Sequence, residues 1–98
     1  MEIARVIGTT VSTIKSERVK DRKLLIVRQT DQKGKALEGL PYVAIDLVDA
    51  GEGELVLTCQ GSAARQTHLT KDCPVDAVIM AVIDSLEVDG ELAFVKGE

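Results

Sequence analysis

The longest apolar stretch of the chain runs from Val75 to Leu86 and is interrupted only by Asp76, Asp84 and Ser85. Read as a strand, it carries apolar side chains on both faces: Val78, Met80 and Val82 on one, and Ile79, Ala81 and Ile83 on the other. A half-buried strand alternates apolar and polar positions, so this pattern predicts cover on both sides. A 98-residue chain has little material for two covering layers. We therefore expect a second subunit to cover the Ile79, Ala81 and Ile83 face, with Asp84 at its end.

The same stretch also has helical spacing, and Asp72 or Pro74 could begin a helix. Two features favour the strand. β-Branched residues are abundant, and the alternation that follows leads into Asp89-Gly90, a preferred two-residue hairpin turn. The pattern predicts a strand from about Ala77 to Val88, preceded by one helical turn at 74–77 and followed by the return strand of a hairpin.

Shorter patterns of the same kind predict the rest of the fold. The expected strands are Met1–Thr13, Lys23–Thr30, Tyr42–Val48 and Glu54–Cys59. Gly8 is placed for a bulge, and Gly61–Arg65 suits one short helical turn. No repeat or linker divides residues 1–98. Five or six short strands with glycine-marked bends indicate an all-β single domain, a small antiparallel barrel with one or two short helical turns.

Composition narrows the function classes. Apolar residues make up 45% of the chain, yet Tyr42 and Phe94 are its two aromatic residues, so the core is aliphatic. A formal charge of −4 and few aromatics argue against a nucleic-acid surface and against an anionic membrane surface. The first residues lack the apolar core of a signal peptide, and no apolar run has membrane-spanning length. We expect a cytoplasmic protein that binds neither membrane nor nucleic acid.

Candidate chemistry is sparse. Cys59, His68 and Cys73 match no zinc-ligand spacing, and two thiols without a secretory signal are expected to be reduced. Ser62 follows a glycine but lacks the G-x-S-x-G elbow, and a single histidine would have to serve any triad. We predict no catalytic residue, no metal and no cofactor, and hence no enzyme.

An assembly module remains. Arg65 follows four small residues, and its guanidinium could donate two hydrogen bonds to a carboxylate or carbonyl across an interface. An arginine that is simply exposed on the surface is an equally good interpretation. Small side chains would let backbones approach closely around a symmetry axis.

Four segments in register are similar to a known family. IARVIGTTVST, VAIDLVDAGEGELVL, GSAAR and PVDAVIMAVIDSLEV resemble the EutN/CcmL family, the pentameric vertex proteins of bacterial microcompartment shells. The resemblance covers nearly the whole chain. Ile45 and Asp49 stand where the family usually has Ala and Gly, and Leu55 stands where many members have Trp.

The resemblance implies an OB-like barrel that closes into a cyclic homopentamer. Such rings occupy the corners of a polyhedral shell whose facets are hexameric shell proteins. It also implies that one segment lies near the fivefold axis or the subunit contacts beside it: Gly61, Ser62, Ala63, Ala64 and Arg65. The competing hypothesis is a free oligomeric barrel that binds a small anion or a protein.

Overall fold

The computed structural model of the chain describes residues 1–10, 23–61 and 77–97. Within them lie seven strands: β1 Glu2–Thr9, β2 Leu24–Gln29, β3 Tyr42–Asp46, β4 Leu55–Gln60, β5 Ala77–Val82, β6 Ser85–Val88 and β7 Glu91–Val95. The predicted helical turns at 61–65 and 74–77 fall almost wholly outside the described residues. No helix in those described ranges is long and apolar enough to cross a membrane.

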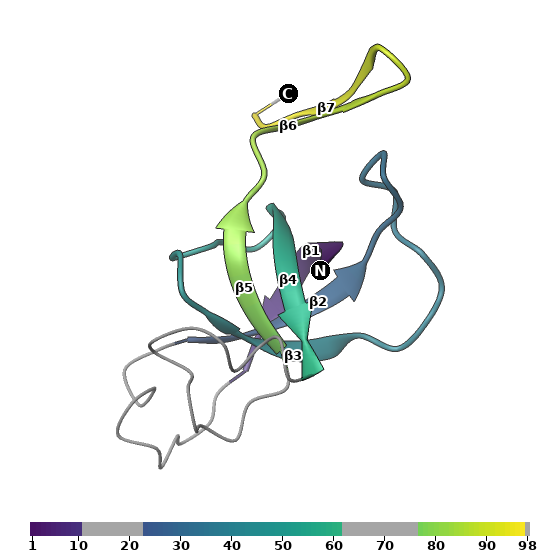
Figure 1. The fold of residues 1–98 in the computed structure, drawn as a ribbon. Helices are drawn as coiled ribbons and strands as arrows, with labels where there is room; N and C mark the ends of the chain where they lie inside the picture. The colour runs from purple at the N-terminus through teal and green to yellow at the C-terminus, as the bar shows by residue number, and fades with distance from the viewer. Residues whose placement is uncertain (11–22, 62–76, 98) are drawn as a thin grey trace.

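The first five strands close into a barrel in the order β1-β2-β3-β5-β4 (Figure 1). All neighbouring pairs are antiparallel except β3 and β5, which run parallel. The predicted small β-barrel is confirmed, with this one parallel pair as its departure from a purely antiparallel sheet. The barrel closes through a short contact between β3 and β5, in which Ile45 pairs with Val78 and Asp46 with Ile79.

The barrel interior is aliphatic, as the composition predicts. Its buried cluster consists of Ala4, Val6, Leu25, Val27, Ala44, Ala50, Val56, Ala77 and Ile79. Tyr42 and Val82 pack against this cluster. Each cross-strand pair shares one face of the sheet, so the pairs Val6–Val27 and Leu25–Ala44 both point inward.

The first bulge is at the predicted place. The pairing of β1 with β2 steps from Val6 to Gly8, so Ile7 is the extra residue and is 39% exposed. The bulge lets β1 bend around the small barrel while Gly8 faces Ile26.

A second bulge overturns the predicted uncovered face of β5. Thr58 pairs with Ile79 while the adjacent Leu57 pairs with Ala81, so Met80 is an extra residue on β5. Because of it, Ile79 and Ala81 lie on opposite faces of the sheet. Ile79 is fully buried in the barrel interior of its own chain and needs no second subunit. Ala81 keeps the outward orientation, whereas Val82 packs against the barrel core and Ile83 is only 8% exposed within its own chain.

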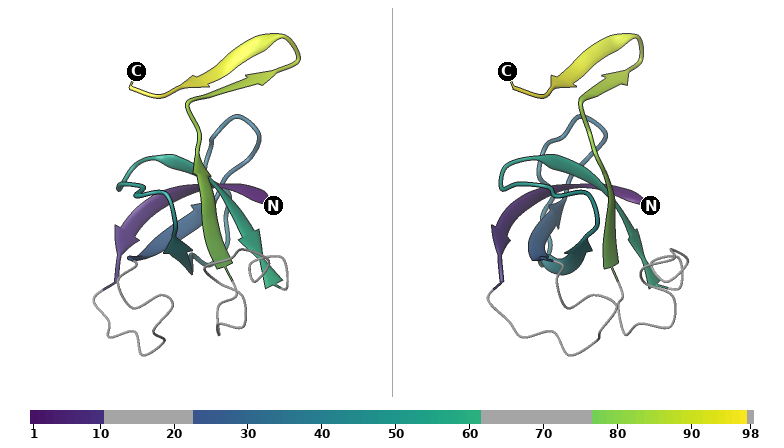
Figure 2. Two further views of the ribbon diagram at one scale, coloured as in Figure 1. Left: turned by 60° about the vertical axis from the view of Figure 1, so that its left-hand side comes forward. Right: turned by 90° about the vertical axis from the view of Figure 1, so that its left-hand side faces the viewer.

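The predicted continuous strand 77–88 is also wrong, since it divides at Ile83 and Asp84. β5 ends in the barrel, whereas β6 pairs only with β7 in a separate two-stranded sheet. Figures 1 and 2 show the backbone of this hairpin beyond one end of the barrel, and the Leu86 side chain reaches Gly34 in a barrel loop. Its predicted turn is confirmed, because Asp89 and Gly90 have φ values of 54° and 78°.

Candidate assembly surfaces

The predicted axis segment begins where β4 ends. Gly61 is exposed, has φ 63°, and follows Gln60 directly. Ser62, Ala63, Ala64 and Arg65 lie outside the described residues, so the structure does not place them. Since β4 and β5 are antiparallel, Gly61 lies near Ala77, at the barrel end opposite to the hairpin (Figures 1 and 2). Both residues line an open hollow of about 470 Å³ together with Tyr42, Val43 and Gln60.

A cluster of polar side chains lies beside this hollow. The Tyr42 hydroxyl donates to Glu2 and lies 2.8 Å from the Thr58 hydroxyl, and Gln60 donates to the same Glu2 oxygen at 2.8 Å. Partial burial, reinforced by the Glu2 carboxylate, raises the pKa of Tyr42 to about 12. The hydroxyl therefore keeps its proton, and the cluster ties β1, β3 and β4 together.

The second predicted surface is reduced to the outer face of β5. Ala81 is half-buried and pairs with Leu57 on β4, which in turn pairs with Ile3 on β1. These three residues form one aliphatic row across adjacent strands, with Met80 37% exposed beside it. Ile83 is 8% exposed and Asp84 is exposed. Sequence reasoning missed the row, because Ile3 and Leu57 become neighbours of Ala81 only through the barrel pairing.

Two arginines lie on the same outer side of the barrel. Arg5 pairs with Arg28 on β2 and with Leu55 on β4. The Arg5 guanidinium is already engaged, since it donates to the carbonyls of Gly53 at 2.7 Å and Gly34 at 3.2 Å. Arg28 has no hydrogen bond or ion pair with the part of the chain that the structure describes.

The hairpin exposes a third surface, which sequence reasoning did not assign to assembly. Leu92 is 63% exposed, and Leu86, Val88 and Phe94 are only half-buried. The carboxylates near its tip are all exposed: Glu87, Asp89 and Glu91. The pairing steps from Leu86–Phe94 to Glu87–Leu92, so Leu92 lies on the hairpin face opposite to Leu86, Val88 and Phe94. Leu86 reaches Gly34 in the loop before β3.

The base of the hairpin is fixed to the barrel. The Lys96 amide donates to the Asp84 carbonyl at 2.8 Å, and the Lys96 ammonium lies 2.7 Å from Glu54. This ion pair lowers the pKa of Glu54, with help from the Gly51 amide, and raises that of Lys96. The hairpin therefore leaves the barrel in a defined direction.

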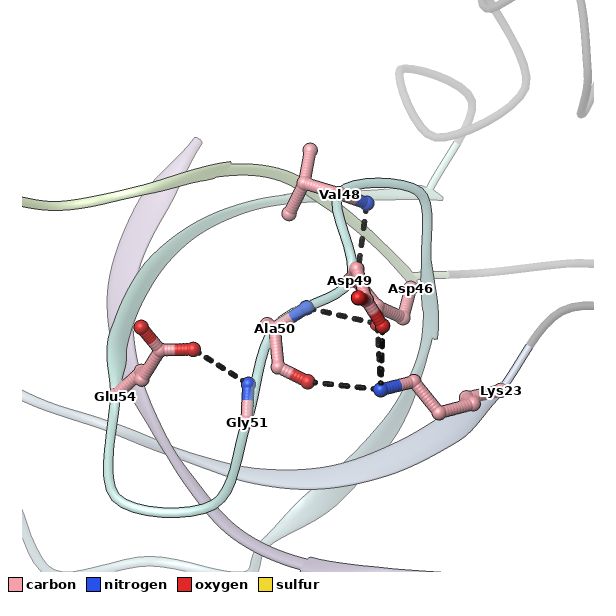
Figure 3. Close-up of polar contacts among 7 residues, drawn as sticks. All are labelled: Lys23, Asp46, Val48, Asp49, Ala50, Gly51 and Glu54. Atoms are coloured by element: carbon pink, nitrogen blue, oxygen red, sulfur yellow. Dashed lines mark hydrogen bonds and ion pairs between the residues drawn. The ribbon is translucent and has the colours of Figure 1, made fainter.

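The loop between β3 and β4 is organised by a buried carboxylate (Figure 3). Asp46, whose side chain is 1% exposed, accepts the amides of Val48 at 3.0 Å and Ala50 at 2.9 Å. Lys23 lies 3.6 Å from Asp46 and 3.0 Å from Asp49, and donates to the Ala50 carbonyl at 3.1 Å. The Asp49 carboxylate, through its hydrogen bond and charge, raises the pKa of Lys23. Every charge here has a structural use, and the arrangement holds the loop.

No cluster of three or more metal-ligating side chains occurs within residues 1–10, 23–61 and 77–97. The Asp46 carboxylate accepts two backbone amides, and the Asp49 carboxylate forms an ion pair with Lys23. Cys59 is a buried free thiol.

Known proteins resemble the chain over its full length. A curated carboxysome shell vertex protein CcmL from a Nostoc species is 41% identical over 96 residues, which cover 98% of this chain and 95% of that protein. A microcompartment shell vertex protein EutN from Salmonella typhimurium is 38% identical over 96 residues, covering 98% and 96%. The chain is therefore similar to a carboxysome protein and to a vertex protein of another microcompartment to nearly the same degree.

Solved structures give the same result. The structure of CcmL from Gloeobacter violaceus superposes with a TM-score of 0.88 at 40% identity and covers all of both chains. GrpN from Rhodospirillum rubrum, a pentameric microcompartment shell protein, superposes with a TM-score of 0.76 at 39% identity, covering 90% of this chain and 99% of its own. These relatives are structural shell proteins and not enzymes. The model of the family described as ethanolamine utilisation protein EutN/carboxysome matches residues 1–84, and the chain belongs to this family.

Proposed function

We propose that the chain assembles into a ring of five and that this ring forms the vertices of a bacterial microcompartment shell. The observation that supports the proposal most strongly is the match, along nearly the whole chain, to proteins named as shell vertex proteins, among them a solved pentamer.

The physical role is geometric. Sheets of hexagonal tiles are flat, and a closed polyhedron needs fivefold tiles at its corners. A head-to-tail contact that closes after five copies supplies such a tile. The ring would meet hexameric facet proteins in the cytoplasm, and its functional residues would be those at contacts between subunits and at the rim.

Two measurements test the proposal. Native mass spectrometry of the purified chain should find five copies per particle, and a monomer that persists at micromolar concentration would contradict the ring. Co-expression with cognate hexameric shell proteins should then give closed polyhedral particles in electron micrographs. The same hexamers without this chain should give sheets, tubes or shells with open corners.

Charge reversals at the rim of the ring provide the control. They should leave the pentamer intact while preventing closure, because the two contacts use different surfaces. If shells close equally well without this chain and without any other vertex protein, the vertex role is wrong. The competing hypothesis of a free oligomeric binding barrel would then take its place.

A further inference from the structure

Leu55 is buried on the outside of the barrel. It is the first residue of β4 and pairs with Arg5 on β1, whereas the next residue, Val56, belongs to the interior cluster. Because successive side chains of a strand point to opposite faces, Leu55 lies on the outer face. Its side chain is nevertheless fully buried. Other parts of the chain must therefore cover it from outside.

The turn between β2 and β3 supplies part of this cover. A Cβ atom at Gly34 would lie 2.9 Å from Leu55 Cδ1 and 3.9 Å from Leu86 Cδ1, so the turn packs directly on the barrel and Leu86 of the hairpin packs on the turn. Gly34 has φ 82°, a conformation that favours glycine. The Asp31 carboxylate holds the turn together, since it accepts two backbone amides of the same turn at 2.8 and 2.9 Å.

The hairpin also contacts the loop between β3 and β4. The Lys96 ammonium lies 2.7 Å from the Glu54 carboxylate. This part of the loop is bonded to β1, because the Gly53 amide donates to the Val6 carbonyl at 2.8 Å and the Val6 amide donates to the Glu54 carbonyl at 3.0 Å. The hairpin therefore contacts two barrel loops, one through Leu86 and the other through Lys96.

The Arg5 guanidinium connects these two loops. One of its nitrogens donates to the Gly53 carbonyl at 2.7 Å, and the other donates to the Gly34 carbonyl at 3.2 Å. A planar guanidinium holds two acceptors in a fixed relative position, which a single ammonium group cannot do. The two loops that contact the hairpin are thus held to each other by one side chain of β1.

We propose that Arg5 is a positioning residue that sets the direction of the β6–β7 hairpin by holding together the two loops that the hairpin contacts. The Ile83 amide donates to the Leu55 carbonyl at 2.9 Å, so the backbone is still fixed to the barrel at this point and can change direction from Asp84 onward. A hairpin already held in one direction loses less conformational freedom when it meets another chain. The contacts lie within one chain, so the inference does not depend on the proposed ring.

Nuclear magnetic resonance tests the contact between the hairpin and the turn. Because a Leu86 methyl lies against Gly34, an Overhauser cross-peak should join that methyl to the Gly34 α-protons in the parent. Arg5→Gln should lose most of this intensity, since the shorter side chain cannot reach both carbonyls. Arg5→Lys should lose only part, since an ammonium can still donate to one of them. A cross-peak of parental intensity in Arg5→Gln overturns the inference.

Hydrogen exchange separates positioning from a general loss of stability. The Lys96 amide donates to the Asp84 carbonyl at the base of the hairpin, whereas the Asp46 amide donates to the Lys23 carbonyl in the barrel. Arg5→Gln should quicken exchange at Lys96 by roughly tenfold, the equivalent of about 1.4 kcal/mol, and leave Asp46 at the parental rate. Equal quickening at both amides would show that Arg5 only stabilises the barrel, and would overturn the inference.

Arg28→Gln is the matched control. Arg28 is the cross-strand partner of Arg5, and its side chain has no hydrogen bond or ion pair with the described residues. Its replacement removes the same charge from the same face and should change neither the cross-peak nor the exchange rates. An equal loss of the cross-peak in Arg28→Gln would overturn the role of the Arg5 hydrogen bonds. If Arg5→Gln does not fold, Arg5→Lys decides, and parental intensity and rates in that variant overturn the inference.

Discussion

Asp49 shows how one residue can satisfy a constraint usually met by glycine. The family resemblance implies Gly at this position, and the backbone there has φ 59°. Aspartate is one of the few non-glycine residues that tolerate this left-handed conformation. The Asp49 side chain is 93% exposed, and its carboxylate lies 3.0 Å from the Lys23 ammonium, so aspartate also forms an ion pair here. Sequence analysis noted the departure but could not see the partner, since Lys23 is far away in the chain.

Asp46 is the residue on which the β3–β4 loop depends. Asp46→Ala should lower the free energy of unfolding by roughly 1–3 kcal/mol, because the buried amide of Ala50 and that of Val48 lose their acceptor. Urea unfolding with an unchanged slope would measure it. Asp49→Asn is the matched control, since asparagine keeps the left-handed backbone and the site is exposed. An equal loss in both variants would contradict the role of the buried carboxylate.

Arg65 remains a prediction from the sequence. If it makes a polar contact between subunits near the ring axis, Arg65→Ala should weaken the ring by roughly 1–3 kcal/mol, because an acceptor would lose its donor. Arg65→Lys should rescue only part of the loss, since a point charge cannot replace a fork. Dilution followed by native mass spectrometry measures the effect. If both variants dissociate at the same concentration as the parent, Arg65 is a surface residue without a partner.

At the level of elements, the local sequence pattern predicted those features that depend on residues close together in the chain. Alternation and turn residues located the barrel strands, the Gly8 bulge and the Asp89-Gly90 turn. The bulge at Met80 was not predictable, because no glycine or proline marks it and it appears only in the pairing with β4. The break between β5 and β6 was not predictable for the same reason, since it depends on a residue distant in the chain. The Lys96 amide donates to the Asp84 carbonyl where the separate two-stranded sheet begins.

The attachment of the hairpin to the barrel should depend on pH. The pKa of Glu54 is lowered in the folded chain, chiefly by Lys96, so its stabilising effect is present above the unfolded pKa near 4.5. It is lost as the pH falls through the folded pKa. Hydrogen exchange of the Lys96 amide should therefore quicken in Glu54→Gln relative to the parent at neutral pH, and the two should converge in acid.

Glu52→Gln is the control for this effect. Glu52 belongs to the same loop and is exposed, with no ion pair to the described residues. Its replacement should leave exchange of the Lys96 amide unchanged at every pH. A difference between Glu54→Gln and the parent that persists undiminished at low pH would show that the Glu54 charge does not anchor the hairpin.

At the scale of the whole molecule, the described residues form a closed barrel and a hairpin, and Leu86 of the hairpin reaches Gly34 in a barrel loop. The family match over residues 1–84 ends where the hairpin begins. The closed barrel, with its aliphatic interior, has the features of an independently stable unit. The sequence analysis expected a second subunit over Ile79, whereas Ile79 is buried in its own chain and Leu92 of the hairpin is 63% exposed.

The proposed ring predicts how the melting temperature of the chain responds to protein concentration. When subunits associate only in the folded state, association stabilises that state by mass action, so the melting temperature rises with protein concentration. The full chain should show this rise. A chain ending at Asp84 should still unfold cooperatively, because the barrel pairs remain. Calorimetry over a hundredfold range of concentration, with β-sheet content followed by circular dichroism, measures both. A full chain whose melting temperature does not change with concentration would contradict the proposed ring.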